Sequence, residues 1–319
     1  MALRLPHHWV WDFWFAQDGD DVHLFFLHAP RSIGNPDLRH SHARIGHAVS
    51  PDLRTWELLP PALTPGPEGS WDDRATWTGS VIRAGARWHM FYTGVSAAEE
   101  GAVQRIGHAM SDDLVRWERA GIAAVAAPEW YEKGAPGVRE EAWRDPWVFA
   151  DGDGSFHMLV TARAREGPED GRGVIGYASS PDVDVWTVGP PRSAPGEFRT
   201  LEVPQLVHLG GRWRVLFSVH THEHSAARLA RPGVQAEGGT HFLVGDTQLG
   251  PYRLDGDTFL LGTLDMRFYA ARAIEHRGSW YLIAWHHTGA DRRFLGELTD
   301  PMPLLIGDDG SLSVQREAE

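Results

Sequence analysis

The chain reads GARWHMFY over residues 85–92, where a glycine-bearing turn leads into a short aromatic run. Aromatic and β-branched runs bounded by glycine turns are typical of β-strands. The pattern occurs five times, and its aromatic runs begin at His23, Trp88, Phe156, Trp213 and Trp280. These starts are 65, 68, 57 and 67 residues apart, which is enough for about four short strands per repeat. The sequence therefore predicts an all-β fold, a five-bladed β-propeller.

A second pattern accompanies the first three repeats. The hexapeptides IGHAVS (45–50), IGHAMS (106–111) and IGYASS (175–180) are each followed by an aspartate and then by a tryptophan. Because buried aromatic side chains dominate core packing, we expect these residues to pack the blades and not to perform chemistry. Long amphipathic patterns of helical period are missing, and no linker divides the chain. We therefore expect a single catalytic propeller domain over 1–319, with no C-terminal β-sandwich.

Composition narrows the class of partner. The chain has 319 residues, of which 42% are hydrophobic, and it contains no cysteine, which excludes disulfides and a cysteine nucleophile. A net charge of -13 argues against nucleic acid and anionic membranes, since both bind clustered Lys and Arg. We expect a small neutral carbohydrate as partner, and no pattern indicates an oligomeric state. The first residues lack the apolar run of a signal peptide, so a cytoplasmic protein is expected.

Three acids stand at related positions just before the glycine turns. Asp12, Asp145 and Glu202 precede the next turn glycine by 7, 7 and 8 residues. All three should begin the innermost strand of their blades at one register, so that their side chains meet on the propeller axis. An acid among apolar neighbours is costly to desolvate unless partners or function compensate. The alternative is that one or more of these acids cap turns.

Glycosidic cleavage needs two carboxyl groups in different protonation states. One must be protonated to donate to the leaving oxygen, and the other must be ionised to attack or stabilise the anomeric carbon. Arg144, which precedes one of the acids, could push the pKa values of the group apart. The three acids therefore predict a glycoside-cleaving site.

These motifs resemble the clan of β-fructosidases and levansucrases, glycoside hydrolase families 32 and 68, whose catalytic domain is a five-bladed propeller. Trp11-Asp12 is similar to the N-terminal Trp-Met-Asn-Asp-Pro-Asn-Gly block, and Arg144-Asp145-Pro146 reproduces an Arg-Asp-Pro motif. Glu202 falls in a Glu-Cys-Pro motif in which Val203 replaces the cysteine. Weaker similarities lie at 46–56, 78–80 and 268–270. The resemblance implies that Asp12 is the nucleophile, that Asp145 stabilises the transition state and that Glu202 is the general acid/base.

The resemblance also implies a substrate and a stereochemical course. We expect hydrolysis of a furanoside, or transfer of its sugar, with a β-fructofuranoside as substrate, a retaining mechanism and no cofactor. Residues 13–15 read Phe-Trp-Phe where the family has Pro-Asn-Gly, which leaves the sugar open. Families 43 and 62, which invert and act on arabinans and xylans, are the nearest alternative. A non-catalytic sugar-binding propeller is the alternative from another class.

Further residues are candidates for contact with the sugar. Trp71, Trp77 and Trp143 could supply apolar platforms for the faces of the sugar, or they could pack in the core. Asp73, Arg144 and Tyr269 could bind sugar hydroxyls. His220, His222 and His224, with Glu223, contain enough nitrogen ligands for Zn²⁺, as do His286 and His287. Because the segment resembles a loop more than a continuous strand, we expect no metal there and place these histidines at the pocket rim.

Overall fold

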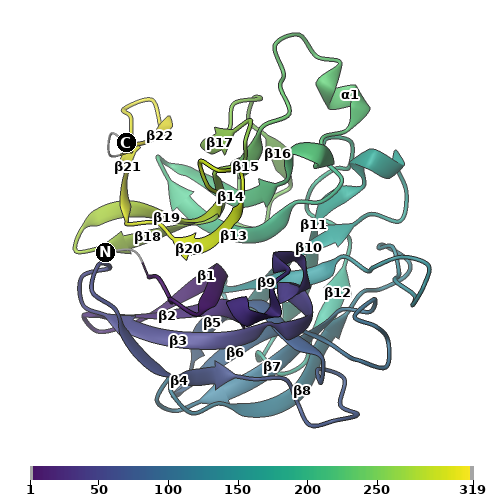
Figure 1. Ribbon diagram of the computed structural model, residues 1–319. Coiled ribbons are helices and arrows are strands. Elements are labelled where there is room, and N and C mark those ends of the chain that lie inside the picture. The colour runs from purple at the N-terminus through teal and green to yellow at the C-terminus, as the bar shows by residue number, and fades with distance from the viewer. Residues whose placement is uncertain (1–2, 317–319) are drawn as a thin grey trace.

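The computed structural model describes residues 3–316, so the first two and last three residues of the predicted domain lie outside the described part. Five antiparallel sheets of four or five strands form the molecule. Each sheet is built from consecutive strands, and the sheets follow one another around a ring (Figure 1). The predicted five-bladed β-propeller is confirmed.

The strands divide among the blades in chain order. Blade 1 contains β1 (His8–Asp18), β2 (Asp21–Pro30), β3 (Arg44–Ser50) and β4 (Glu57–Leu63). Blade 2 contains β5 (Ala75–Ala84), β6 (Arg87–Val95), β7 (Arg105–Ser111) and β8 (Glu118–Val125). Blade 3 contains β9 (Trp143–Ala150), β10 (Phe156–Arg163), β11 (Gly173–Ser180) and β12 (Thr187–Gly189).

The last two blades each carry a fifth strand. Blade 4 contains β13 (Glu202–Leu209), β14 (Arg212–Val219), β15 (Gly238–Gly245), β16 (Tyr252–Leu254) and β17 (Leu261–Thr263). Blade 5 contains β18 (Phe268–His276), β19 (Ser279–Thr288), β20 (Phe294–Leu298), β21 (Met302–Ile306) and β22 (Leu312–Val314). The short helices are η1 (Arg31–Ile33), η2 (Pro36–His42), η3 (Glu169–Gly171), η4 (Thr221–Glu223) and α1 (Ala226–Leu229). None of the helices within residues 3–316 has the length and apolar character needed to cross a membrane.

The repeated aromatic residues pack one blade against the next. Phe25 on β2 meets Trp117 of blade 2 edge-on, with ring centroids 5.7 Å apart. Phe91 on β6 meets Trp186 of blade 3 in the same way at 5.2 Å. Edge-to-face pairs of this kind stabilise beyond the area that they bury. The recurring tryptophans therefore define the fold, as the sequence predicts.

A β-bulge interrupts the innermost strand of every blade at the same place. The pairing of the inner strand with its neighbour shifts register at this point in all five blades. The residues at the first bulged position are Asp12, Thr78, Asp145, Val203 and Ala270. A bulge leaves a residue out of the ladder and re-aims its side chain. The five bulges thus mark equivalent positions on the innermost strands, and three of these residues, Asp12, Thr78 and Asp145, line one cavity.

Backbone amides at three of these bulges bind the preceding blade. The amide of Asp145 donates to Thr93 Oγ1 at 2.9 Å. The equivalent bonds run from the Val203 amide to Thr161 Oγ1 at 3.2 Å and from the Ala270 amide to Ser218 Oγ at 3.0 Å. All three bulge residues have positive φ angles, of 57°, 55° and 45°. The repetition shows that these three positions are structurally equivalent.

The ring closes between blade 5 and blade 1 without a shared strand. Within the described residues, each sheet contains strands of one blade only. The closing contacts include bonds from the buried Arg272 Nε to the Phe13 carbonyl at 3.1 Å and from Arg31 Nη2 to the Leu295 carbonyl at 2.9 Å. Figure 1 shows β1 lying beside β18 and β20 at this boundary. Side chains and loops therefore hold the first and last blades together.

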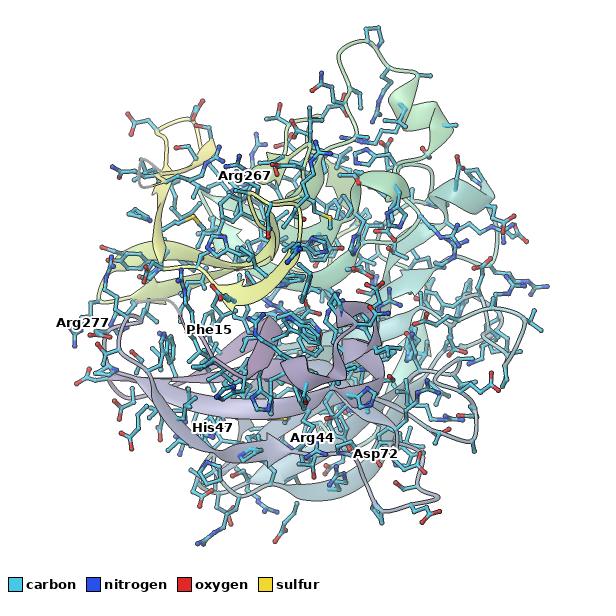
Figure 2. The ribbon with its side chains drawn as sticks, viewed as in Figure 1. Phe15, Arg44, His47, Asp72, Arg267 and Arg277 are labelled. Atoms are coloured by element: carbon cyan, nitrogen blue, oxygen red, sulfur yellow. The ribbon has the colours of Figure 1, made fainter. Side chains whose placement is uncertain are left out.

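Residues 13–15, which depart from the family motif, belong to the core. Phe13 and Trp14 are fully buried. Phe15 is half-buried and meets Phe13 edge-on at 5.4 Å; Figure 2 labels it beside the boundary between blades 1 and 5. These rings pack in the hydrophobic core, and none of them lines the cavity described below.

Candidate active site

A cavity of about 730 Å³ opens where the inner strands begin. Its lining comes from the inner strands of blades 1 to 4 and from the loops around them. Asp12, Asp145 and Glu202 all line it. The structure thus brings together three carboxyl groups that are up to 190 residues apart in the chain.

Asp12 is held from both neighbouring blades. Thr78 Oγ1 donates to its Oδ2 at 2.8 Å, and Trp285 Nε1 donates to its Oδ1 at 3.0 Å. Burial raises the pKa of Asp12, the Thr78 hydrogen bond opposes that effect, and the charge of Glu202 adds to it. The carboxyl is fixed in orientation with both oxygens occupied.

Asp145 is the most enclosed of the three acids, with 3% of its surface exposed. Thr161 Oγ1 donates to its Oδ2 at 2.8 Å, and the Val203 amide donates to the same oxygen at 3.1 Å. Burial raises the pKa of Asp145 to about 7, although the neighbouring Arg144 acts to lower it. Asp145 therefore has an affinity for protons near neutral pH that an exposed aspartate lacks.

Glu202 has the opposite electrostatic environment. Arg144 Nη2 donates to its Oε1 at 2.5 Å, and the Tyr269 hydroxyl donates to its Oε2 at 2.5 Å. His220 Nε2 lies 3.9 Å from the same Oε2. Burial alone would raise the pKa of Glu202, but Arg144 first, then His220 and Tyr269, lower it to about 2. These partners keep the carboxyl ionised.

The register of Glu202 corrects the prediction from spacing. Glu202 pairs with Ser218 just as Arg144 pairs with Thr161 and Tyr269 with Trp285. Val203, not Glu202, occupies the bulge position of Asp12 and Asp145. The reason is that the first bulged residue stands 7 residues before the first turn residue in blades 1, 2, 4 and 5, whereas Glu202 stands 8 before Gly210. The acid is therefore displaced by one residue, between the equivalent side chains of Arg144 and Tyr269.

Three of the predicted sugar-contact residues lie at the site. Arg144 and Trp77 line the cavity, and Tyr269 contacts Glu202. Trp77 Nε1 donates to the His40 carbonyl at 2.7 Å, which fixes the orientation of the indole.

The other three predicted sugar-contact residues do not line this cavity. Trp143 is fully buried and packs on Tyr131 at 4.9 Å, because successive side chains of a strand point to opposite faces and its neighbour Arg144 takes the cavity side. Trp71 stacks on Tyr92 inside blade 2 at 5.8 Å. Asp73 accepts the amides of two loop residues at 2.8 and 2.7 Å, so it braces a turn.

The histidine segment contributes one residue to the site. His220 lines the cavity. His224 turns away, and its Nε2 bonds the Glu237 carbonyl at 2.7 Å while its ring packs on Phe198 at 5.2 Å. The short helix η4 (Thr221–Glu223) lies between them, so the segment does not continue as a strand with three imidazoles on one face.

Two residues that the sequence analysis missed complete the site. His40 reaches the cavity from η2 (Pro36–His42), a helix that begins with the Asn35 side chain accepting the Asp37 amide at 3.0 Å. The Asn-Pro pair signals a helix start, but nothing in it shows that the helix ends over the cavity. Trp285, which binds Asp12, is 273 residues away in the chain and carries no local signal at all.

A second cavity of about 690 Å³ adjoins the first. The two share Val138, Arg139, Glu140 and Arg144 in their walls. The second cavity continues between blades 3 and 4, past Thr200 and Glu223. The space around the carboxyl groups is therefore larger than the first cavity alone.

Comparison with known proteins gives one family match. The model described as "Glycosyl hydrolases family 32 N-terminal domain" matches residues 15–293, a range that includes Asp145 and Glu202 and begins three residues after Asp12. An insoluble β-fructofuranosidase, isoenzyme 7, of Oryza sativa subsp. indica is 36% identical over 141 residues, which are 41% of this chain and 21% of that protein. Sucrose-6-phosphate hydrolase of Zymomonas mobilis is 28% identical over 210 residues, 62% of this chain and 38% of that protein. The chain thus matches less than two-fifths of the length of these relatives.

Solved structures share the fold. An inulosucrase from Halalkalicoccus jeotgali bound to kestose superposes with a TM-score of 0.80 at 24% identity, covering 98% of this chain and 89% of that one. An exo-1,5-α-L-arabinanase from a bovine ruminal metagenomic library gives a TM-score of 0.65 at 15% identity, covering 97% of both chains. At these identities the likeness establishes the propeller architecture.

Proposed function

This chain belongs to glycosyl hydrolase family 32, and we propose that it is a retaining glycosidase that hydrolyses a β-fructofuranoside or transfers its fructosyl group. The relatives named as β-fructofuranosidases and sucrose-6-phosphate hydrolase support this substrate class. The single observation that carries the proposal is the convergence of Asp12, Asp145 and Glu202 in one cavity, each in a different electrostatic environment.

In the first step, the Asp12 carboxylate attacks the anomeric carbon, and the bond from that carbon to the leaving oxygen breaks. Glu202 gives its proton to the leaving oxygen. In the second step, Glu202 takes a proton from water, the resulting hydroxide attacks the anomeric carbon, and Asp12 is released. A sugar hydroxyl in place of water gives transfer instead of hydrolysis.

The side chains of the cavity favour the protonation states opposite to those that this mechanism needs. Burial raises the pKa of Asp12, whereas Arg144 and Tyr269 hold Glu202 ionised. The mechanism requires an ionised Asp12 and a protonated Glu202, so the bound sugar must reverse the order. A sugar hydroxyl that accepts from Arg144 would draw the guanidinium away from Glu202 and raise the pKa of that acid. Asp145, adjacent to Arg144, would bind sugar hydroxyls.

The cavity walls suit a small carbohydrate. Trp77 offers an apolar face, and Arg144, His40 and His220 offer polar groups that can bind hydroxyls. The adjoining cavity provides room for further sugar units on the leaving-group or acceptor side.

The purified protein should be incubated with sucrose, with inulin-type and levan-type oligosaccharides, and with aryl arabinofuranosides and xylosides. Product and anomer are followed by NMR, with Asp12→Asn and Glu202→Gln as controls. Fructose released with retention, and lost in both variants, is the expected result. Pentose released with inversion would overturn the substrate assignment, and no turnover of any glycoside would replace it with a sugar-binding role.

A further inference from the structure

The first two blades carry the same pair of hydrogen-bonded histidines. In blade 1, His23 Nδ1 and His47 Nε2 are 2.9 Å apart, and in blade 2, His89 Nδ1 and His108 Nε2 are 2.8 Å apart. The second histidine of each pair stacks on a phenylalanine of its own blade, at 4.4 and 4.7 Å. The pair is thus a packing feature of the repeat, and by itself it does not indicate a ligand.

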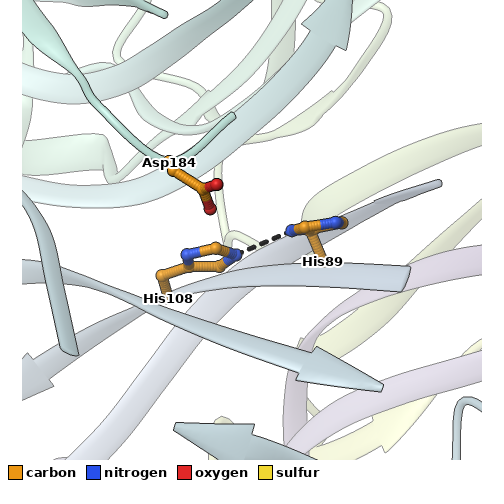
Figure 3. Close-up of side chains that lie close together, drawn as sticks. All are labelled: His89, His108 and Asp184. Atoms are coloured by element: carbon orange, nitrogen blue, oxygen red, sulfur yellow. Dashed lines mark hydrogen bonds between the residues drawn. The ribbon is translucent and has the colours of Figure 1, made fainter. Parts of the chain in front are cut away.

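Blade 2 differs because an acid stands against its pair. One ligand atom each of His89, His108 and Asp184 lie within 4.8 Å of one another. Figure 3 shows the Asp184 carboxylate, which comes from the turn after β11 of blade 3, directed at the hydrogen-bonded edge of the two rings. Asp184 is exposed, and within residues 3–316 no hydrogen bond or ion pair engages its carboxylate.

We propose that His89, His108 and Asp184 bind a Zn²⁺ ion that links blade 2 to blade 3. Two imidazole nitrogens, one carboxylate oxygen and a water in the fourth position form an ordinary tetrahedral zinc site. Two nitrogens that each lie about 2.1 Å from a tetrahedral ion are about 3.4 Å apart, so the pair opens by roughly 0.6 Å. The proton of the histidine–histidine hydrogen bond moves to the other nitrogen of the donating ring, and none is released.

The surroundings of the pair favour metal binding. His89 and His108 are 6% and 4% exposed, and burial lowers the pKa of both, that of His108 to about 4. A neutral imidazole has one unprotonated nitrogen, so each ring can supply one ligand atom. The exposed Asp184 leaves the outer side of the site open to an entering ion and to its water.

The ion would act on stability and not on sugar cleavage. Its ligands come from β6, β7 and the turn after β11, and none of them lines the cavity of Asp12, Asp145 and Glu202. A ligand that binds only the folded protein stabilises it in proportion to the logarithm of its concentration over its dissociation constant. Zinc should therefore raise the unfolding temperature without any glycoside present.

The test is a titration of Zn²⁺ into metal-free protein, followed by calorimetry and by thermal unfolding. One ion per chain is expected, together with a higher unfolding temperature. Asp184→Asn keeps the size of the side chain and removes its charge, and it should weaken zinc binding at least about tenfold and abolish the thermal shift. Unchanged zinc affinity in Asp184→Asn, or no binding to the unmodified protein, would overturn the proposal.

The chain offers a matched variant that gains a site. The amides of Val115 and Asp184 both donate to the turn aspartate two residues before them, at 2.9 and 3.1 Å, so the two residues hold equivalent positions. Val115→Asp should place a carboxylate against the His23 and His47 pair of blade 1. Calorimetry should then count two zinc ions per chain. A count that stays at one in the folded variant would contradict the claim that an acid completes the pair.

Discussion

The inner strands of blades 3 and 4 follow the same backbone path but give their acids opposite environments. Each has a bulge with a positive φ, a proline after the bulge and an amide bonded to a hydroxyl of the preceding blade. In blade 3 the acid is the bulge residue Asp145, which faces a hydroxyl and an amide. In blade 4 it is Glu202, one residue earlier, which faces Arg144 and Tyr269.

A shift of the acid by one residue along the strand is therefore accompanied by an opposite shift of its pKa. The pKa of Asp145 is raised to about 7, first by burial, whereas that of Glu202 is lowered to about 2 despite burial, chiefly by Arg144. A repeated backbone thus gives two carboxyl groups of one cavity different proton affinities.

The largest expected effect is on catalytic rate, and it should depend on the leaving group for Glu202 but not for Asp145. Glu202→Gln should lower kcat on a sugar leaving group by about 10²–10⁴-fold, because no proton reaches the departing oxygen. An aryl fructoside, whose leaving group needs little protonation, should recover most of that loss in its first step. Asp145→Asn should be slow on both substrates. Steady-state and burst-phase rates check this, and equal rescue of both variants would break the comparison.

Replacing the two acids by their amides should change the free energy of unfolding in opposite directions. The pKa of Asp145 is higher in the folded protein than in the unfolded one, so folding loses stability as pH rises from about 4 to about 7. Asp145→Asn should therefore raise the free energy of unfolding at pH 8 by about 2–4 kcal/mol. Glu202→Gln should lower it, since the pKa of Glu202 is depressed in the folded state and Arg144 loses its partner. Urea unfolding of both variants at pH 5 and pH 8 measures the two signs.

The pH profile should shift when Tyr269 loses its hydroxyl. The Tyr269 hydrogen bond favours the ionised form of Glu202, so Tyr269→Phe raises the pKa of that acid. The basic limb of kcat, which reports the sugar-bound enzyme, should move to higher pH by about one unit, because the acid then keeps its proton longer. Tyr177→Phe, in which the lost hydroxyl binds His157 at 2.7 Å away from the cavity, should leave the limb in place. A limb that moves to lower pH would contradict the assignment of Glu202 as the acid.

The smallest effect concerns binding. His40 lines the cavity, whereas His42, two residues later on the same helix, does not. His40→Gln should raise KM about threefold to tenfold with little change in kcat, as the loss of one neutral hydrogen bond to the sugar predicts. His42→Gln is the matched control and should leave both constants unchanged. A fall in kcat alone for His40→Gln would place His40 in the chemical step instead.

The fold could be predicted from the sequence because each blade repeats the same local signals. Glycine turns, aromatic runs and the following tryptophans are short-range patterns, and five copies at similar spacing outweigh any single ambiguity. The convergence of Asp12, Asp145 and Glu202 in one cavity followed from the same repetition. The register of Glu202 could also have been obtained, since a constant spacing of 7 residues assigns the bulge of blade 4 to Val203.

The remaining parts of the site could not be predicted from local patterns. Trp143 and Arg144 are adjacent in sequence but lie on opposite faces of β9, so a strand boundary one residue off exchanges core and cavity. His40 depends on where the end of η2 lies relative to the cavity, and Trp285 depends on how blade 5 closes on blade 1. Such contacts are set by the closed ring and not by any segment of the chain.

The boundary between blades 1 and 5 also determines when the site can exist. Asp12 lies on β1, which is synthesised before the other blades, but one of the two groups that hold its carboxyl belongs to Trp285, on β19 of blade 5. Proteins fold while they leave the ribosome, N-terminal segments first. The carboxyl of Asp12 therefore cannot be held in its final orientation until the other four blades have been translated. A nascent chain arrested before blade 5 would contain all three carboxyl groups and yet lack an assembled site, so the site is complete only after blade 5 has packed against blade 1.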